Sequence, residues 1–154
     1  MKKLRLYLDT SIFGGLFDEE FEEFTVPLFE RIKNSEFEII YSNITEQELE
    51  SAPKKIRETV NQMPKSLTHF VKSDLETANL AKRYVDEGVV GATSFADCLH
   101  IALATIHNAN ILLSWNFKHI VNVVRIVGYN SINSIEGYKP IDIRSPRELM
   151  NYED

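Results

Sequence analysis

The chain of 154 residues is 44% hydrophobic and 26% charged, and its 17 Lys and Arg against 23 Asp and Glu give a net charge of −6. This length and composition predict a single globular domain over 1–154 that buries a core without cross-links. The negative charge argues against broad nucleic-acid binding through surface charge alone. It does not exclude a metal-dependent nuclease, because carboxylates that await a cation make such a protein acidic.

Cys98 is the only cysteine, so the chain cannot form an internal disulfide. We therefore expect the protein to reside in the reducing cytoplasm. The first residues precede a strand-like segment and not the apolar region of a signal peptide. No apolar run approaches the roughly 18 residues of a membrane span. We therefore expect no membrane partner.

Apolar periodicity and turn residues predict alternating strands and helices along the whole chain. The expected strands are at 4–8, 37–41, 68–71, 111–114 and 141–143. Between the first three strands we expect a short helical piece at 12–17, a helix at 26–34 with Pro27 in its first turn, a helix opened by Thr45 and a basic helical stretch at 54–60. Further on we expect a helix capped by Ser73 that runs to about Asp86, a helix from 94 to 106, a region at 117–136 that begins as a helix and loses its pattern around Gly128 and Asn130, and a tail helix with Ser145 as its N-cap. This alternation favours an α/β fold with a mostly parallel sheet between two layers of helices.

The segment 94–116 organises the rest of the chain. Its first part has apolar residues at helical spacing, with Asp97 in the first turn. The run 111–114 is typical of a central parallel strand. Such a strand delivers Trp115 and Asn116 to the carboxyl edge of the sheet, where open α/β sheets bind ligands.

Three carboxylates follow a strand or open the next helix: Asp9, Glu48 and Asp97. Each also has a structural explanation, because Asp9 can cap the helix that follows it. The other two lie in patterns that resemble capping boxes, Thr45-x-x-Glu48 and Ser94-x-x-Asp97.

The three carboxylates together favour a site over three separate caps. Helix starts that follow parallel strands lie on one edge of the sheet, so these side chains can converge there. Carboxylates in close proximity repel one another and raise their pKa values. A fold keeps such a cluster chiefly when a divalent cation neutralises it, and oxygen ligands suit Mg²⁺ or Mn²⁺.

Four segments of the chain resemble the PIN-domain family, which includes the toxin halves of VapC-type toxin–antitoxin pairs: LYLDTSIF, the IT-x-x-EL run at 44–49, FADCLHIALA and LLSWN. The resemblance extends from about Leu4 to Asn116. It implies a metal-dependent ribonuclease with a three-layer α/β/α fold and the sheet order 3-2-1-4-5. By this resemblance Asp9, Glu48 and Asp97 would hold Mg²⁺ or Mn²⁺ and activate water for hydrolysis of RNA. It also implies a homodimer and an antitoxin protein as partner.

The sequence departs from the family at the fourth acidic position. Asn116 stands where many relatives carry an aspartate. An Asn carbonyl can ligate a hard cation but brings no charge. We therefore expect Asn116 to be a weaker fourth metal ligand, which puts tight binding of a second metal in doubt.

Polar side chains beside these positions are candidate substrate contacts. The resemblance suggests that Thr10 or Ser11 orients a metal-bound water. Lys118, His119 and Arg125 are candidate phosphate contacts, although each also fits a solvated surface. 

Three further residues near Asp97 and Asn116 have simpler interpretations. His100 lies three residues after Asp97 on the same side of the helix, so an Asp-x-x-His metal pair is an alternative without other support. Cys98 and Trp115 are expected to be packing residues.

The sequence therefore predicts a cytoplasmic PIN-type ribonuclease that cuts single-stranded or loop RNA with Mg²⁺ or Mn²⁺. Two alternatives remain open. One is a PIN-like module that binds RNA or a partner protein without cleavage. The other is a metal-dependent phosphatase with Asp9 as nucleophile, which lacks the second aspartate expected two residues later.

Overall fold

A computed structural model describes residues 2–152 of the protein. The strands are β1 (Arg5–Leu8), β2 (Glu38–Ser42), β3 (Thr68–Val71), β4 (Ile111–Leu113) and β5 (Asp142–Arg144). The α-helices are α1 (Thr10–Gly15), α2 (Glu22–Lys33), α3 (Asn43–Leu49), α4 (Lys54–Arg57), α5 (Leu75–Asp86), α6 (Phe95–Ile106), α7 (Val123–Ile135) and α8 (Pro146–Tyr152). Within the described range, no helix has the length and apolar character needed to span a bilayer.

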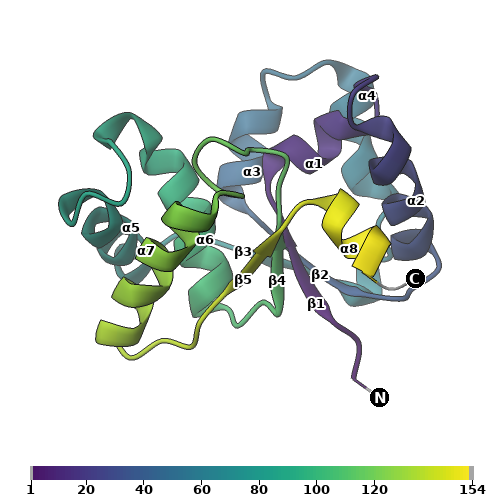
Figure 1. The fold of residues 1–154 in the computed structure, drawn as a ribbon. Coiled ribbons are helices and arrows are strands. Elements are labelled where there is room, and N and C mark those ends of the chain that lie inside the picture. The colour runs from purple at the N-terminus through teal and green to yellow at the C-terminus, as the bar shows by residue number, and fades with distance from the viewer. Residues whose placement is uncertain (1, 153–154) are drawn as a thin grey trace.

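The strands form one sheet in the order β3-β2-β1-β4-β5, and every pair is parallel. Helices α5, α6 and α7 lie on one side of the sheet in Figure 1, and α1, α2 and α8 lie on the other. The predicted three-layer α/β/α fold with strand order 3-2-1-4-5 is therefore confirmed. All five strands end at the same edge of the sheet, so the loops that follow them meet there.

The central strand β1 is apolar on both faces because helices cover both faces of the sheet. Leu6 and Leu8 pack into the core beneath α1 and α2, whereas Tyr7 packs into the core beneath α5, α6 and α7. Neighbouring strands alternate in the same way, since successive side chains of a strand point to opposite faces. The sheet is thus held from both sides, and its carboxyl edge is fixed by two separate cores.

Helix α2 begins earlier than its sequence pattern predicts. Pro27 lies inside the helix and not in its first turn, so that expectation is wrong. Two glutamates, Glu22 and Glu23, occupy the first turn, where acidic side chains favour the positive end of the helix dipole. The acidic stretch that suggested a turn therefore belongs partly to the helix.

Helix α7 begins later than predicted, at Val123. The Asn122 side chain accepts a hydrogen bond from the Arg125 amide and caps the helix there. Gly128 and Asn130 do not interrupt α7. Gly128 leaves room for Val89, because a Cβ at this position would lie 2.9 Å from a Val89 methyl. The Asn130 side chain bonds both backbone groups of Ile141, which ties the helix to the start of β5.

Two predicted helix starts are also shifted. Ser42, and not Thr45, is the N-cap of α3. Asp74, and not Ser73, is the N-cap of α5 and forms a capping box with Thr77. In both helices several hydroxyl or carboxylate side chains compete for the same orphan amides, and tertiary packing selects one of them.

Gly15→Ala should destabilise the fold by about 1–3 kcal/mol, because it overpacks a closed contact. A Cβ at Gly15 would lie 2.7 Å from Trp115 Nε1 and 2.8 Å from Thr25 Oγ1, between two atoms that share a 2.9 Å hydrogen bond. Urea unfolding measures the loss. Gly14→Ala is the matched control, since a Cβ there meets no atom within 4 Å, and it should be neutral or stabilising. Equal losses in the two variants would contradict this account.

Candidate active site

Asp9 lies directly after the central strand and is 4% exposed. Its carboxylate accepts hydrogen bonds from the hydroxyls of Ser11, at 2.5 Å, and Ser114. Each of these hydroxyls in turn accepts a backbone N–H, from Trp115 and Asn116 respectively, at 2.9 Å. Because each serine oxygen already accepts an N–H, its own proton is free to point at Asp9.

The charge of Asp9 is nevertheless poorly compensated. No Lys or Arg of the described chain forms an ion pair with it. Burial raises the pKa of Asp9 above its ordinary value, and the nearby Asp97 adds to the rise. Interaction with His100 and the hydrogen bonds from the two serines lower the pKa but do not offset the effect of burial.

Glu48 lies near the end of α3 and reaches two partners from other elements. Its Oε1 accepts a 2.8 Å hydrogen bond from the Thr10 hydroxyl and a 2.6 Å hydrogen bond from His100 Nε2. His100 is 2% exposed, and its Nδ1 lies 2.7 Å from the hydroxyl of Tyr7. The chain of bonds is complete when the His100 proton is on Nε2, where it is donated to Glu48, and Nδ1 accepts from Tyr7.

These contacts keep Glu48 ionised. Burial raises the pKa of this carboxylate, but the hydrogen bond and the interaction with His100 and the Thr10 hydroxyl outweigh it. The net result is a pKa below the ordinary value for glutamate. Glu48 therefore stays negative at neutral pH while one of its oxygens, Oε2, has no hydrogen-bond partner among residues 2–152.

Asp97, in the first turn of α6, is held by a histidine from the loop after β4. His119 Nδ1 lies 3.0 Å from Asp97 Oδ2, and the same ring nitrogen lies 3.1 Å from the Ser94 hydroxyl. Both side chains of the Asp97–His119 pair are about one-quarter exposed, so solvent reaches them. As with Glu48, one oxygen of Asp97 has no hydrogen-bond partner within the described chain.

None of the three carboxylates acts as the helix cap that the sequence also suggested. Asp9 occupies the N-cap position of α1, but its side chain makes no capping hydrogen bond. Glu48 lies in the last turn of α3, away from the amides that Thr45 was expected to cap with it. Ser94 makes no side-chain cap at α6, and Asp97 bonds His119 instead. The capping explanations are therefore wrong for all three residues.

Asn116 shapes the loop after β4. Its Oδ1 accepts the backbone N–H groups of Lys118, at 3.1 Å, and His119, at 3.0 Å. Asn side chains commonly form turns of this kind with the backbone that follows them. The turn also brings His119 back toward Asp97. The side-chain carbonyl that was predicted to be a weak metal ligand thus already accepts two hydrogen bonds from the backbone.

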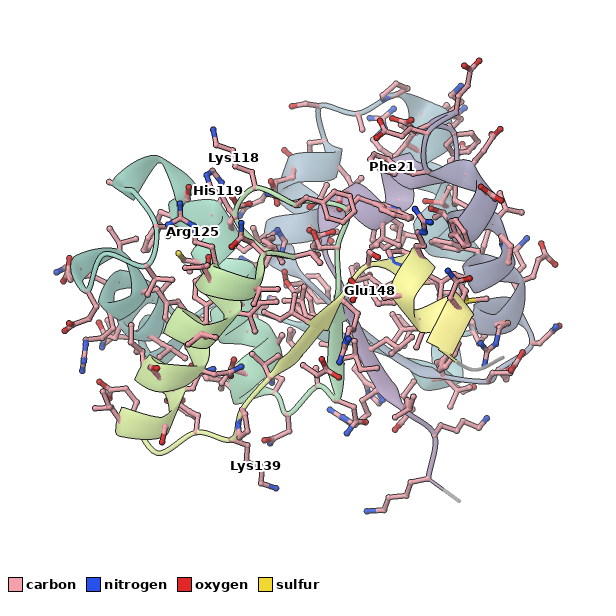
Figure 2. All side chains as sticks on the ribbon, viewed as in Figure 1. Phe21, Lys118, His119, Arg125, Lys139 and Glu148 are labelled. Atoms are coloured by element: carbon pink, nitrogen blue, oxygen red, sulfur yellow. The ribbon has the colours of Figure 1, made fainter. Side chains whose placement is uncertain are left out.

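The remaining predicted contacts divide between the site and its surroundings. Thr10 and Ser11 both bond the carboxylates directly. Figure 2 shows Lys118 pointing outward at the edge where the strands end, with His119 beside it. Arg125 lies at the start of α7, and its guanidinium donates to the Val89 carbonyl, so this side chain supports the loop before α6.

Three hydrogen-bond partners of the carboxylates were not predicted from the sequence. The spacing suggested a pair of His100 with Asp97, but the structure pairs His100 with Glu48, 52 residues away. His119, expected to be a phosphate contact or a solvated side chain, bonds Asp97, and Ser114, which had no expected role, bonds Asp9. A signal for His100 existed, since it lies on the apolar face of the helix and a buried imidazole needs partners. Cys98 and Trp115 are buried packing residues, as predicted.

The structure joins the three carboxylates at one edge without forming a closed ligand cage. Thr10, next to Asp9, bonds Glu48, and His100, one turn after Asp97, bonds Glu48 as well. Among residues 2–152, no three Asp, Glu, His or Cys side chains are arranged to hold a metal ion by themselves. A cavity of about 740 Å³ lies by β5 and α8 and is lined by none of the predicted site residues. A cavity of about 520 Å³ includes Ser11 and Asn116 and thus adjoins the carboxylates.

The chain thus has a parallel α/β sheet with acidic side chains at its carboxyl edge, and comparisons with known proteins identify its family. Residues 6–118 match the model of the PIN domain, so the chain belongs to the PIN-domain family. The chain has no match among curated protein sequences.

Solved structures support the same fold at low sequence identity. FitAcB from Neisseria gonorrhoeae is 16% identical, with a TM-score of 0.60 over 94% of this chain and 99% of that one. VapBC2 from Rickettsia felis, bound to a DNA fragment from its promoter, is 14% identical, with a TM-score of 0.55 over 92% and 98%. DNA-bound VapBC from Salmonella typhimurium is 15% identical, with a TM-score of 0.53 over 93% and 98%.

Asp9→Asn should stabilise the metal-free protein at neutral pH. Because the pKa of Asp9 is raised, the folded state favours the protonated carboxyl, and ionisation of Asp9 opposes folding. The stability that protonated Asp9 contributes is therefore lost as the pH rises through the raised pKa. Asparagine does not ionise, so its advantage over the wild type should be small near pH 4, where aspartate ordinarily titrates, and larger at about pH 7. Urea unfolding at both pH values measures the difference.

Asp74→Asn is the control of opposite sign. The hydrogen bond from the Thr77 amide lowers the pKa of Asp74. Ionised Asp74 therefore stabilises the fold at any pH above the ordinary aspartate pKa, and this stabilisation is lost only at more acid pH. This variant should be less stable than the wild type by an amount that stays nearly constant between about pH 7 and 4. An Asp9→Asn protein with no gain at neutral pH would contradict the uncompensated charge described for Asp9.

Proposed function

We propose that this PIN-domain protein is a Mg²⁺- or Mn²⁺-dependent endoribonuclease with Asp9, Glu48 and Asp97 as its catalytic carboxylates. The observation that carries the proposal is the buried carboxylate of Asp9 at the end of the central strand, which no Lys or Arg of the described chain neutralises. A buried charge without a counter-ion is costly, so proteins pair it or place it against a metal. The other two carboxylates lie at the same edge with an oxygen free.

The donor set suits a hard divalent cation. All three groups are carboxylates, and Mg²⁺ commonly binds through one or two carboxylates while keeping several waters. Binding of that kind needs no closed cage of three protein ligands, which agrees with the open arrangement of the side chains. Glu48 Oε2 and the unbonded oxygen of Asp97 are the atoms available to such an ion or to its waters.

When bound, a divalent cation would lower the pKa of a water and stabilise negative charge on a phosphodiester. The protein supplies the orientation. Ser11 and Ser114 hold the Asp9 carboxylate as a pure acceptor, and His100 and Thr10 fix Glu48 through one oxygen. Glu48, whose pKa is lowered, is positioned to accept a proton from the attacking water through its other oxygen. Hydrolysis would form a bond from the water oxygen to phosphorus and break one P–O ester bond, and the departing alkoxide oxygen would take up a proton to become a hydroxyl.

Asp97→Asn should abolish the stabilisation of the protein by Mn²⁺ and slow RNA cleavage by about 10²–10³-fold. At Mn²⁺ near 100 times its dissociation constant, the wild type should gain about 2.7 kcal/mol of stability. Thermal melts and cleavage of a single-stranded RNA, each with and without Mn²⁺, measure the two effects. Glu46→Gln removes an exposed carboxylate of α3 that contacts none of these groups and should behave as wild type.

The two readouts separate the alternatives. A full Mn²⁺ shift in Asp97→Asn would remove this residue from the metal site. A wild-type protein that binds Mn²⁺ but leaves RNA intact would instead be a binding module without nuclease activity, the alternative that an asparagine at the fourth acidic position supports.

Asn116→Asp should raise Mn²⁺ affinity about tenfold. An aspartate can keep the turn through one oxygen and present the other to the cation, where asparagine has an N–H donor. A unit-charge pair at about 4 Å and an effective dielectric near 20 is worth roughly 4 kcal/mol, and desolvation and repulsion reduce the net gain to about 1–2 kcal/mol. Calorimetric titration at low salt measures it. Unchanged affinity would restrict Asn116 to its role in the turn.

We further propose that the protein acts in the cytoplasm with an antitoxin protein and as a homodimer. The VapBC neighbours, which pair two proteins, support the antitoxin partner. Exposed apolar side chains on α7 support an additional protein contact: Val123, Val124, Val127 and Ile135. Sedimentation of the protein, alone and with the product of an adjacent reading frame, tests both, and a monomer that ignores that product would contradict them.

A further inference from the structure

The cavity of about 520 Å³ beside the carboxylates has a lining unlike the rest of the site. It lies between α1, the start of α2 and α4, and its volume is within the range of roughly 300–1,000 Å³ that ligand pockets occupy. The residues that line it include three aromatic ones, Phe17, Phe21 and Trp115, and Lys55. The hydrolysis proposed above assigns no task to any of these four side chains.

The cavity is continuous with the candidate active site through two residues. Ser11 lines the cavity and donates its hydroxyl proton to Asp9. Asn116 lines it from the loop after β4. A group seated in the cavity therefore lies one side chain away from the carboxylate at the end of the central strand. A substrate whose phosphodiester reaches Asp9 would place its neighbouring nucleoside here.

The aromatic side chains provide a surface for a planar ring. Phe17 is 43% exposed, so much of this large apolar side chain faces solvent at the cavity. Phe21 stacks on Trp115 with ring centroids 4.4 Å apart and an angle of 20° between the ring planes. In Figure 2 the Phe21 ring lies at the same edge of the molecule as Lys118 and His119. Exposed rings at a strand-end cavity are the platforms on which unpaired bases stack.

Two charged side chains line the cavity, Asp18 and Lys55, and Lys55 is the one that can contact a phosphate. Its Nζ lies 4.9 Å from the centre of the Phe17 ring, so a cation and an aromatic surface occur together. In a chain with a net charge of −6, such a local cation matters, because the protein as a whole does not attract phosphates. An aromatic platform beside a lysine fits a base and its phosphate better than it fits an uncharged apolar ligand.

We propose that this cavity, which we call the base pocket, binds the unpaired nucleobase next to the scissile phosphodiester, with Phe17 as the stacking surface and Lys55 as a phosphate contact. The proposal rests on the nuclease function proposed above and restricts its substrate. A base within a duplex is already stacked and paired, so the pocket selects single-stranded or looped RNA.

Trp115 makes the base pocket directly observable. It is the only tryptophan, it lines the cavity, and it stacks on Phe21. Adenosine 5′-monophosphate titrated into the metal-free wild type should quench its fluorescence saturably, whereas ribose 5-phosphate, which has no base, should not. Phe17→Leu should weaken adenosine monophosphate binding by about tenfold, in the range of lost base stacking. Phe70→Leu, which removes a comparably exposed ring on β3, should bind as wild type.

A second pair of variants tests occupancy of the same space without removing an aromatic ring. Gly14 lines the cavity, and a Cβ there meets no atom within 4 Å, so Gly14→Leu should fill the base pocket and abolish the quenching while Gly14→Ala should retain it. Equal nucleotide binding in wild type, Phe17→Leu and Gly14→Leu would overturn the proposal. So would quenching by a partner protein but not by the nucleotide, which would make the cavity a peptide site.

The test also distinguishes this proposal from the nuclease function. Asp97→Asn should lose the Mn²⁺ shift but keep the nucleotide quenching, whereas Phe17→Leu should keep the Mn²⁺ shift and raise KM for single-stranded RNA more than it lowers kcat. Base-dependent quenching in a wild-type protein that does not cleave RNA would support the pocket and contradict the nuclease. RNA cleavage without base-dependent quenching would support the nuclease function and contradict the base pocket.

Discussion

The polar network at the carboxyl edge of the sheet is built around one buried carboxylate, Asp9, whose position is set by the pairing of β1 with β4. Leu8 pairs with Leu113, so the residues that follow them, Asp9 and Ser114, are brought side by side as the strands leave the sheet. The Ser114 hydroxyl then donates to Asp9 while accepting the amide of Asn116. Formation of the central sheet and orientation of the candidate catalytic group are therefore one event.

The cost of burying this charge explains the surrounding polar network. Two serines supply hydrogen bonds, but neither supplies a positive charge, and burial still raises the pKa of Asp9. Sites that bind cations commonly retain such destabilised groups, because the bound cation offsets the free-energy cost of the buried charge. The neighbouring histidines, His100 and His119, hold the other two carboxylates in place without closing the ligand sphere.

The sequence pattern predicted elements well and their boundaries less well, for identifiable reasons. The five strands were found because buried parallel strands read as short apolar runs. Helix starts were misplaced where several polar residues compete for the same amides, as at Ser42 against Thr45 and at Asp74 against Ser73. The start of α7 was predicted too early, because apolar periodicity does not reveal that the chain turns at Asn116 or that Asn122 caps the helix.

By itself, the sequence determined the alternation of strands and helices, the acidic residues at the strand ends and the departure at Asn116. These are local properties, set by side-chain type and spacing along the chain. Only the tertiary structure decided that His100 bonds Glu48, that His119 bonds Asp97, and that aromatic rings from the segment between α1 and α2 and from the loop after β4 line one cavity. Those contacts join residues far apart in the chain, and the register of the parallel sheet and the packing of its two cores bring them together.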